Sequence, residues 1–334
     1  MQNKSYFPKI FYLPLLFLFL NFSSSAQIFH LENFHLSFEP IIEYSSGVLN
    51  ETFYQSLDKN KKRSLLEWER KIWLYGMNIN GNYQKIYFSV GVFSSIPGEC
   101  GEMRDSDWKN PLNYEMKTNY SFGTNFSDKN YDILLSISYQ VEPYSGFFIY
   151  PKIQSQYLYD SFYRKKGAVG WYADSDWSSD GKNHWWYDDE SMKFPSLNPN
   201  TGKTRKLAGI NYLQHSFYVW AGFSLGFRIF HFHADFDFLI SPFTYFSSED
   251  YHKTATGNEI YHLILHNYFE SYKFGLNLRY EISRYFDITL RGLLLITKES
   301  KGNLYYGWNL ISDQSSGMNS KIESISIGCG IKFL

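Results

Sequence analysis

Two short motifs carry side chains that could do chemistry together. Asp105 and Asp107 form an Asp-x-Asp, and Asp250 and His252 form an Asp-x-His. Residues two apart in an extended chain share a face, so the two carboxylates can share a water or a proton. By the same geometry Asp250 can orient the His252 imidazole and raise its basicity toward a water. Taken alone, each motif is more often structural or a solvated surface pair than catalytic.

A third set of polar residues alternates with phenylalanines between positions 230 and 238. Alternating His and Asp side chains on one face could bind a metal. Polar barrel lumens, however, are commonly filled by charged side chains that satisfy one another. We therefore predict a structural role and no metal site for His231, His233, Asp235 and Asp237.

Period-two alternation identifies the elements that must position these motifs. In the last segment, apolar residues at 325, 327, 329, 331 and 333 alternate with small or polar residues. In the segment at 230–238, Phe and Ala alternate with His and Asp. This pattern predicts strands with one face toward lipid and the other toward a polar lumen.

The composition supports a membrane barrel over a helical membrane protein. Mean hydropathy is −0.37, and after Ala26 no stretch approaches 18 uninterrupted apolar residues, which excludes membrane-spanning helices. Aromatic residues nevertheless make up 20% of the chain, with 29 Tyr and 30 Phe. Such an excess is typical of the aromatic girdles of outer-membrane barrels. The net charge of −1 gives no support for a nucleic-acid partner.

The N-terminus predicts a secretory signal peptide. Lys4 and Lys9 precede an apolar run from Ile10 to Leu20, and small polar residues lead to a cleavage point after Ala26. We expect a signal peptide over residues 1–26 and one domain over 27–334, because no internal repeat or linker divides the chain.

Connections of two kinds alternate along the chain. Short polar turns are predicted at Asn80-Gly81-Asn82, Ser127-Asp128-Lys129-Asn130 and Ser283-Arg284. Long irregular segments are predicted at Leu49–Arg63, Ile96–Asn113, Gly146–Leu207, Ser247–His266 and Lys298–Asn319. The fold class that follows is all-β: a ten-stranded antiparallel up-and-down transmembrane β-barrel with long extracellular loops. Its final strand would close against the first.

This topology places both chemical motifs in outer loops, where they could meet across the barrel mouth. The location predicted is the cell outer membrane, with the site facing outside. Cys100 and Cys329 lie far apart in the sequence, and whether they pair is left open.

At this point the residues resemble the omptin family of outer-membrane endopeptidases. The likeness is carried by Gly47 to Tyr54 with Glu51, by Ser64-x-Leu66-Glu67-Trp68, by Asp105-x-Asp107-Trp108 before Asn110-Pro111, and by Asp250-x-His252. It covers essentially the whole chain after the signal peptide.

The resemblance implies roles for individual residues. Asp250 and His252 would act as a dyad in which His252 takes the proton from a nucleophilic water. Asp105 and Asp107 would hold that water and stabilise the tetrahedral intermediate. Neither a covalent intermediate nor a metal or other cofactor is implied. Two acidic groups would bind a basic residue of the substrate; Glu51 matches one of them, but Ser248 stands where the second, an Asp, is expected.

Omptins also need lipopolysaccharide, held by outward-facing arginines. Pro143 stands at one of those positions and His215 at another, so the lipid dependence would be altered or absent. The predicted function is thus an aspartic-type endopeptidase that acts on polypeptides, in contact with outer-membrane lipid and as a monomer. The alternative is a non-catalytic barrel, either an adhesin or a small pore.

Overall fold

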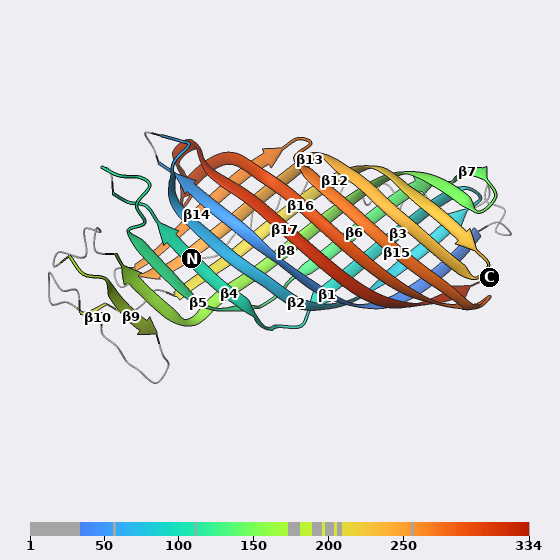
Figure 1. The fold of residues 1–334 in the computed structure, drawn as a ribbon, viewed down its shortest axis with the longest axis horizontal. Helices are drawn as coiled ribbons and strands as arrows, with labels where there is room; N and C mark the ends of the chain where they lie inside the picture. Colours follow the sequence, from blue (N-terminus) through green and yellow to red (C-terminus); the bar gives the residue numbers. More distant parts are fainter. Residues whose placement is uncertain are drawn as a thin grey trace.

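The chain forms one closed antiparallel barrel (Figure 1). The computed structural model describes residues 34–55, 58–110, 112–172, 181–188, 196–197, 204–205, 209–254 and 257–333. The predicted signal peptide, residues 1–26, lies outside these residues. None of the described residues is helical, and so none forms an apolar helix of membrane-spanning length.

Ten barrel positions are filled by thirteen strand segments, because three positions are each occupied by two collinear segments. The undivided strands are β1 (Phe34–Tyr54), β2 (Lys62–Tyr83), β8 (Phe147–Trp171), β12 (Gly209–Ile229), β13 (Phe232–Thr254), β16 (Phe286–Tyr306) and β17 (Asn309–Phe333). The divided ones are β3 (Ile86–Ser95) with β4 (Gly98–Asp107), β5 (Asn119–Ser127) with β6 (Tyr131–Tyr139), and β14 (Gly257–Asn267) with β15 (Ser271–Ser283). β1 pairs with both β2 and β17, so the ring closes and the ten-stranded prediction is confirmed.

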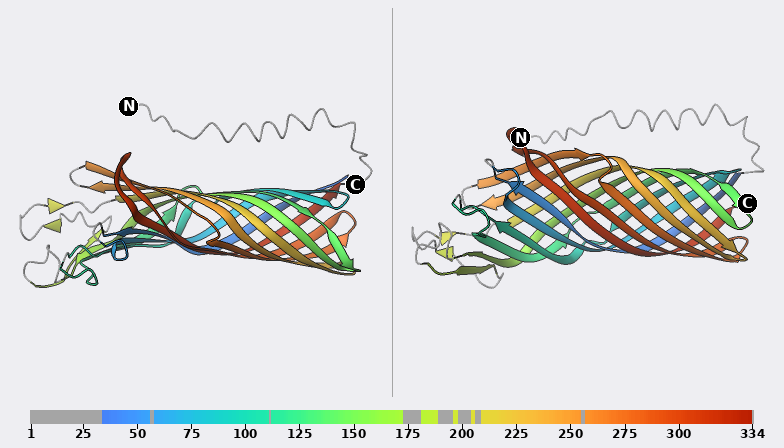
Figure 2. Two further views of the ribbon diagram at one scale, coloured as in Figure 1. Left: turned by 90° about the horizontal axis from the view of Figure 1, so that it is seen from above. Right: turned by 45° about the horizontal axis from the view of Figure 1, so that its top comes forward.

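Small segments decorate the two ends of the barrel. β7 (Val141–Tyr144) and β9 (His184–Asp188) pair with β8, and β10 (Ser196–Leu197) pairs with β11 (Thr204–Arg205). Figure 2 shows that the end with β9 and β10 is broader, and that its hairpins diverge. We call this the outer end and the end with β7 and the C-terminus the inner end.

Alternation along the strands follows the predicted faces. In β17 the side chains of Ile325, Ile327, Ile331 and Phe333 are each at least 44% exposed, whereas Ser326, Gly328 and Gly330 are buried. On β2, outward residues change from Glu67, Glu69 and Lys71 near the outer end to exposed Trp73, Tyr75 and Met77 farther in. This change marks the edge of an apolar belt around the barrel, as an outer-membrane fold requires.

The five outer connections were predicted in the right number but were assigned too many residues, and the inner turns were predicted only in part. Asn80-Gly81-Asn82 lies within β2, and the turn follows at residues 84–85. The segment 127–130 is an interruption between collinear β5 and β6, so it is not an inner turn. Only the turn after Ser283 lies where it was expected.

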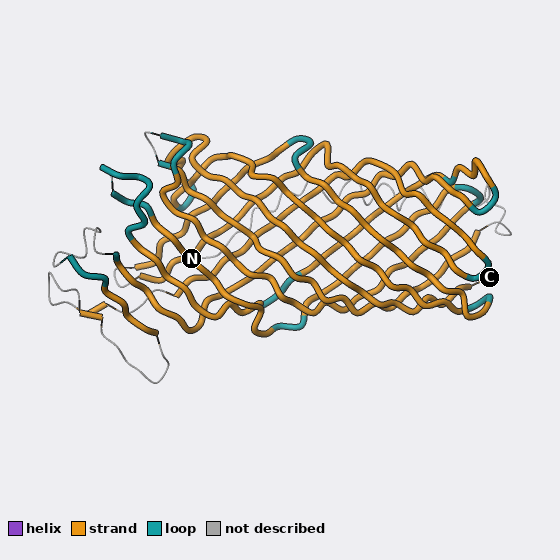
Figure 3. Tube along the Cα trace, in the orientation of Figure 1, coloured by secondary structure: helices purple, strands orange, loops and turns teal. Residues whose placement is uncertain are grey.

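The five segments predicted as long loops consist largely of strand. For example, residues 147–171 of the supposed 146–207 insertion form β8, and β4 occupies most of 96–113. These stretches look irregular in sequence because their outward faces are polar. Their inward faces bury apolar side chains, and they remain paired well beyond the belt, as the long continuous strands of Figure 3 show.

The lumen is filled by side chains. The ladder predicted from the sequence does face inward: Lys152 Nζ lies 3.0 Å from Asp237, Asn277 donates to Asp235, and Arg279 contacts His233. Nearer the outer end, Arg70 Nε donates to Asp160 Oδ1 at 2.9 Å, with both side chains at most 3% exposed. Contacts among charged and polar side chains are the role predicted for His233, Asp235 and Asp237, and Arg70 with Asp160 adds a pair that the sequence analysis did not name.

Candidate active site

The Asp-x-Asp motif lies on a strand, not in a loop. Asp105 and Asp107 belong to β4, where they pair in register with Leu66 and Ser64 of β2. Leu66 and Ser64 are buried and face inward, so both carboxylates do too. The Ser64 hydroxyl lies 3.3 Å from Asp105 Oδ1, and Lys109 Nζ donates to Asp107 Oδ2 at 2.6 Å. The two carboxylates share one face, as the i, i+2 spacing predicts.

The Asp-x-His motif lies near the outer end of β13. His252 Nε2 is 2.6 Å from Asp250 Oδ2, a charge-assisted hydrogen bond. The Asp250 side chain is fully buried, and that of His252 is 19% exposed. Because Nε2 faces Asp250, Nδ1 is the nitrogen left to accept a proton from elsewhere.

The two motifs face each other across the ring. β4 and β13 are separated by β5, β8 and β12, so their inward faces look toward one another. The charge of His252 lowers the pKa of Asp105, and the charge of Asp105 raises the pKa of His252. The structure therefore brings the four residues that sequence reasoning selected to one end of one lumen.

The electrostatics of the site arise from buried acids beside a single imidazole. Burial and the neighbouring charge of Asp107 raise the pKa of Asp105 to about 7. Burial alone would lower the pKa of His252, but the Asp250 carboxylate outweighs it and raises that pKa to about 9. The imidazole is thus mostly protonated at neutral pH, and Asp105 titrates near neutrality.

Glu51 and Ser248 also meet at this end, and both are buried. The Ser248 hydroxyl donates to Glu51 Oε2 at 2.8 Å. Burial, and then the charge of Asp250, raise the pKa of Glu51 to about 8. At neutral pH this carboxyl therefore holds a proton and presents no negative charge.

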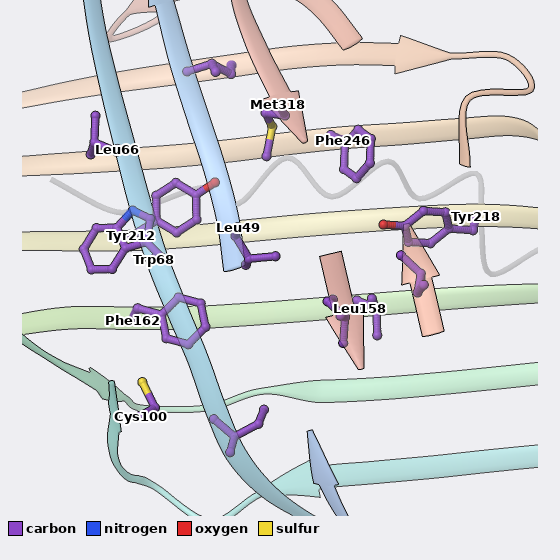
Figure 4. Packing of buried hydrophobic residues seen from close by; sticks show 14 of the residues in the cluster. Leu49, Leu66, Trp68, Cys100, Leu158, Phe162, Tyr212, Tyr218, Phe246 and Met318 are labelled. Carbon is purple, nitrogen blue, oxygen red and sulfur yellow. The ribbon is translucent and has the colours of Figure 1, made fainter. Parts of the chain in front are cut away.

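An aromatic layer supports the site from the inner side. The Trp68 ring stacks on Tyr212 with centroids 5.3 Å apart and on Phe162 at 6.1 Å. Figure 4 shows this group from β2, β8 and β12 with Leu49 and Leu66 beside it. Tyr212 pairs in register with Asp250, so the dyad rests directly against this layer. All three rings are essentially inaccessible to water, which rigidifies the base of the site.

Sequence reasoning missed the residues contributed by β14. Glu259 pairs in register with His252, and Tyr261 pairs with Asp250. A signal for them existed: Glu-x-Tyr follows Asp-x-His closely enough to form a hairpin, which would place the two pairs side by side. Reading 247–266 as an irregular loop concealed this pairing.

The two positions compared with lipid-binding arginines lie far apart along the barrel. Pro143 is in β7 at the inner end. His215 lies on β12 opposite Tyr159, about a dozen residues along β8 from the inner hairpin, and its Nδ1 is 2.7 Å from the Tyr157 hydroxyl. Because one lipid headgroup cannot span the dozen strand residues between these levels, Pro143 and His215 do not belong to one site.

The two cysteines are free. Cys100 is buried in β4 near the outer end, and Cys329 is in β17 near the inner end.

Comparisons with known proteins support the fold. No protein-family model matches the chain, and no curated protein sequence matches it significantly. Among solved structures, the outer membrane protease OmpT from Escherichia coli superimposes with a TM-score of 0.72 at 17% sequence identity, covering 90% of this chain and 97% of that one.

Two neisserial structures align over most of this chain but superimpose poorly. Neisserial surface protein A has 9% identity over 90% of this chain and 97% of its own, with a TM-score of 0.26. The translocator domain of autotransporter NalP from Neisseria meningitidis has 7% identity over 96% and 95%, with a TM-score of 0.27. TM-scores this low do not indicate a shared fold. The similarity to OmpT establishes that this chain has the fold of a ten-stranded outer-membrane β-barrel.

Proposed function

We propose that the protein is an outer-membrane endopeptidase that hydrolyses peptide bonds with an activated water. The observation that carries this proposal is the hydrogen-bonded Asp250–His252 pair facing Asp105 from across the ring. The structural similarity to an outer membrane protease supports it, although the shared fold by itself would also suit other functions.

In the proposed reaction, the neutral His252 imidazole takes a proton from water through Nδ1 as the water attacks the peptide carbonyl carbon. Asp250 holds the ring through Nε2 and stabilises the imidazolium that forms. Asp105 and Asp107 accept hydrogen bonds from the attacking water and fix its position. His252 then returns the proton to the leaving nitrogen, the C–N bond breaks, and a carboxylate and an amine result.

The proposed orientation places the site outside the cell. The apolar belt matches a bilayer, and the longest connection, from β8 (ending at Trp171) to β12 (beginning at Gly209), is at the outer end, as in outer-membrane barrels. On β2 the belt begins at Trp73, whereas Leu66 marks the level of the site, so the site lies beyond the lipid. One chain closes the whole ring, so a monomer suffices.

The preference for a basic substrate residue is expected to be weak at neutral pH. Glu51 is buried and protonated there, and Ser248 offers a hydroxyl in place of a second carboxylate. A cationic side chain gains little from two neutral groups. Such a preference should strengthen above pH 8, as Glu51 loses its proton.

The pore alternative is not favoured. Trp220, Tyr218 and Lys273 fill the lumen below the site and are at most 5% exposed, and Lys273 donates to Gln156. A narrow barrel filled in this way offers no aqueous path. The adhesin alternative stays open to the experiment.

The test is cleavage of a quenched peptide library by the refolded protein in detergent micelles, with and without added lipopolysaccharide. We expect cleavage by the wild type in both conditions and none by His252→Ala. His231→Ala is the matched control, because that histidine lies at the inner end beside Tyr280. A folded wild type that cleaves nothing in either condition would reject the protease and favour the adhesin.

A further inference from the structure

Two side chains of β14 face the proposed dyad from the neighbouring strand. Glu259 lies directly opposite His252 in the β13–β14 register, and Tyr261 lies opposite Asp250. Directly opposed residues on antiparallel strands share a face and bring their Cβ atoms to about 5 Å. Both β14 residues therefore sit on the lumen side with the imidazole.

Tyr261 links the imidazole to Glu259. Its ring meets the His252 ring edge to face, with centroids 6.1 Å apart and planes at 89°. Its hydroxyl donates to Glu259 Oε2 at 3.2 Å. The Tyr261 ring is held in turn by Phe53 of β1 at 5.8 Å and by Tyr306 of β16 at 5.5 Å. A ring packed by three neighbours has little freedom to rotate, so it restrains the imidazole plane.

We propose that Glu259 and Tyr261 are positioning residues for His252: the Tyr261 ring fixes the plane of the imidazole, and the Glu259 carboxylate, held by the Tyr261 hydroxyl, stabilises the imidazolium from the neighbouring strand. This inference rests on the proposed function, but its geometry does not. Asp250 supplies the hydrogen bond along β13, and β14 supplies orientation and a second charge.

Several acidic side chains face His252, so the effect of the Glu259 charge on the His252 pKa must be separated from theirs. Asp250 acts from the same strand through a hydrogen bond, Asp105 acts from β4 through its charge, and Glu51 faces the dyad from β1. The charge of Glu259 also raises the pKa of His252. Removing that charge leaves the Asp250 hydrogen bond in place, so the effect of β14 can be measured by itself.

The first measurement is an NMR titration of the His252 imidazole in the folded protein, with the signal assigned by its loss in His252→Ala. We expect Glu259→Gln to lower the pKa of His252 by about half a unit to one unit. Glu249→Gln is the matched control, since Glu249 is three residues from His252 but points outward, toward His262. An unchanged His252 pKa in Glu259→Gln, or an equal shift in the control, would overturn the role of Glu259.

The second measurement separates the ring of Tyr261 from its hydroxyl. Tyr261→Leu should reduce kcat about tenfold with little change in KM, because misorienting a general base affects the reaction more than substrate binding. Tyr261→Phe keeps the ring and removes only the hydroxyl that holds Glu259, so it should recover most of that loss. Tyr251→Leu removes an outward tyrosine and should leave kcat unchanged. Equal kcat values for Tyr261→Leu and wild type would overturn the positioning role.

The two proposals fail in different ways. If the wild type cleaves no peptide but Glu259→Gln still shifts the His252 titration, the protease is rejected and the β14 interaction stands. If cleavage depends on His252 but neither β14 variant changes the titration or kcat, the protease stands and the positioning role is rejected.

Discussion

The middle of the lumen and its outer end differ in whether their buried acidic side chains form ion pairs with basic ones. In the middle, two buried acids form ion pairs: Asp160 with Arg70, and Asp237 with Lys152. At the outer end, Asp105, Asp250 and Glu51 crowd around one imidazole. Paired charges hold the strands together, whereas crowded acids raise one another's pKa and leave groups able to exchange protons near neutral pH.

The largest effect should come from removing the imidazole of the crowded end. His252→Ala should reduce kcat/KM for a cleaved peptide by about 10²–10⁴-fold, the usual contribution of a general base. The variant should also be less stable than the wild type, because the fully buried Asp250 loses its hydrogen-bond partner, so its activity is measured where both proteins remain folded. Steady-state kinetics together with denaturant unfolding in micelles measure both quantities. Loss of activity together with loss of folding would mean that His252 belongs with the structural charges.

In the middle of the lumen, by contrast, we expect a substitution to affect stability, because the charged residues there form ion pairs. Arg70→Met should destabilise the barrel by about 3–5 kcal/mol, because it leaves Asp160 buried without its cation. The double variant Arg70→Met/Asp160→Leu should recover most of that loss, since neither charge then remains. Denaturant unfolding of the two variants checks this. If the double variant were no more stable than Arg70→Met, the loss of stability would not come from the unpaired charge of Asp160.

The sequence predicts the strands well where polar and apolar residues alternate, and poorly where they do not. The belt strands alternate sharply, so the faces of β17 and of the inner half of β13 can be assigned from the sequence. The Asp-x-Asp and Asp-x-His spacings place the two side chains of each motif on one face, but they do not determine which way that face points. The outer strand ends, such as residues 247–254 of β13 and 257–266 of β14, do not alternate sharply between polar and apolar residues, so the sequence predicts irregular segments there. Their pairing is a non-local property, so the β14 partners of the dyad and the buried state of Glu51 appear only in three dimensions.

The pH dependence of activity tests the titration of His252 and Asp105 at the outer end together. The pKa of His252 is raised to about 9, and the base form is the neutral one. Each pH unit below 9 therefore removes about nine-tenths of the active form, and kcat/KM should rise about tenfold per unit between pH 7 and pH 8 and level off above 9. Ionisation of Asp105 near pH 7 should steepen the acidic side. A profile that is flat or falling from pH 7 to pH 9 would rule out the neutral imidazole as the base.

The smallest effect concerns Glu51, which has a raised pKa but no proposed proton transfer. An acid whose pKa rises from 4.5 to about 8 on folding keeps its proton only in the folded state, so it lowers stability progressively as pH rises toward 8. Glu51→Gln keeps the shape and an acceptor for Ser248 but cannot ionise. Its stability relative to wild type should therefore increase by about 2 kcal/mol between pH 6 and pH 8. The control is Glu323→Gln, an exposed acid beside Lys321, which should show no such trend. If the Glu51→Gln difference were independent of pH, Glu51 would be ionised when folded, and the outer end would hold an anionic subsite able to bind a basic residue at neutral pH.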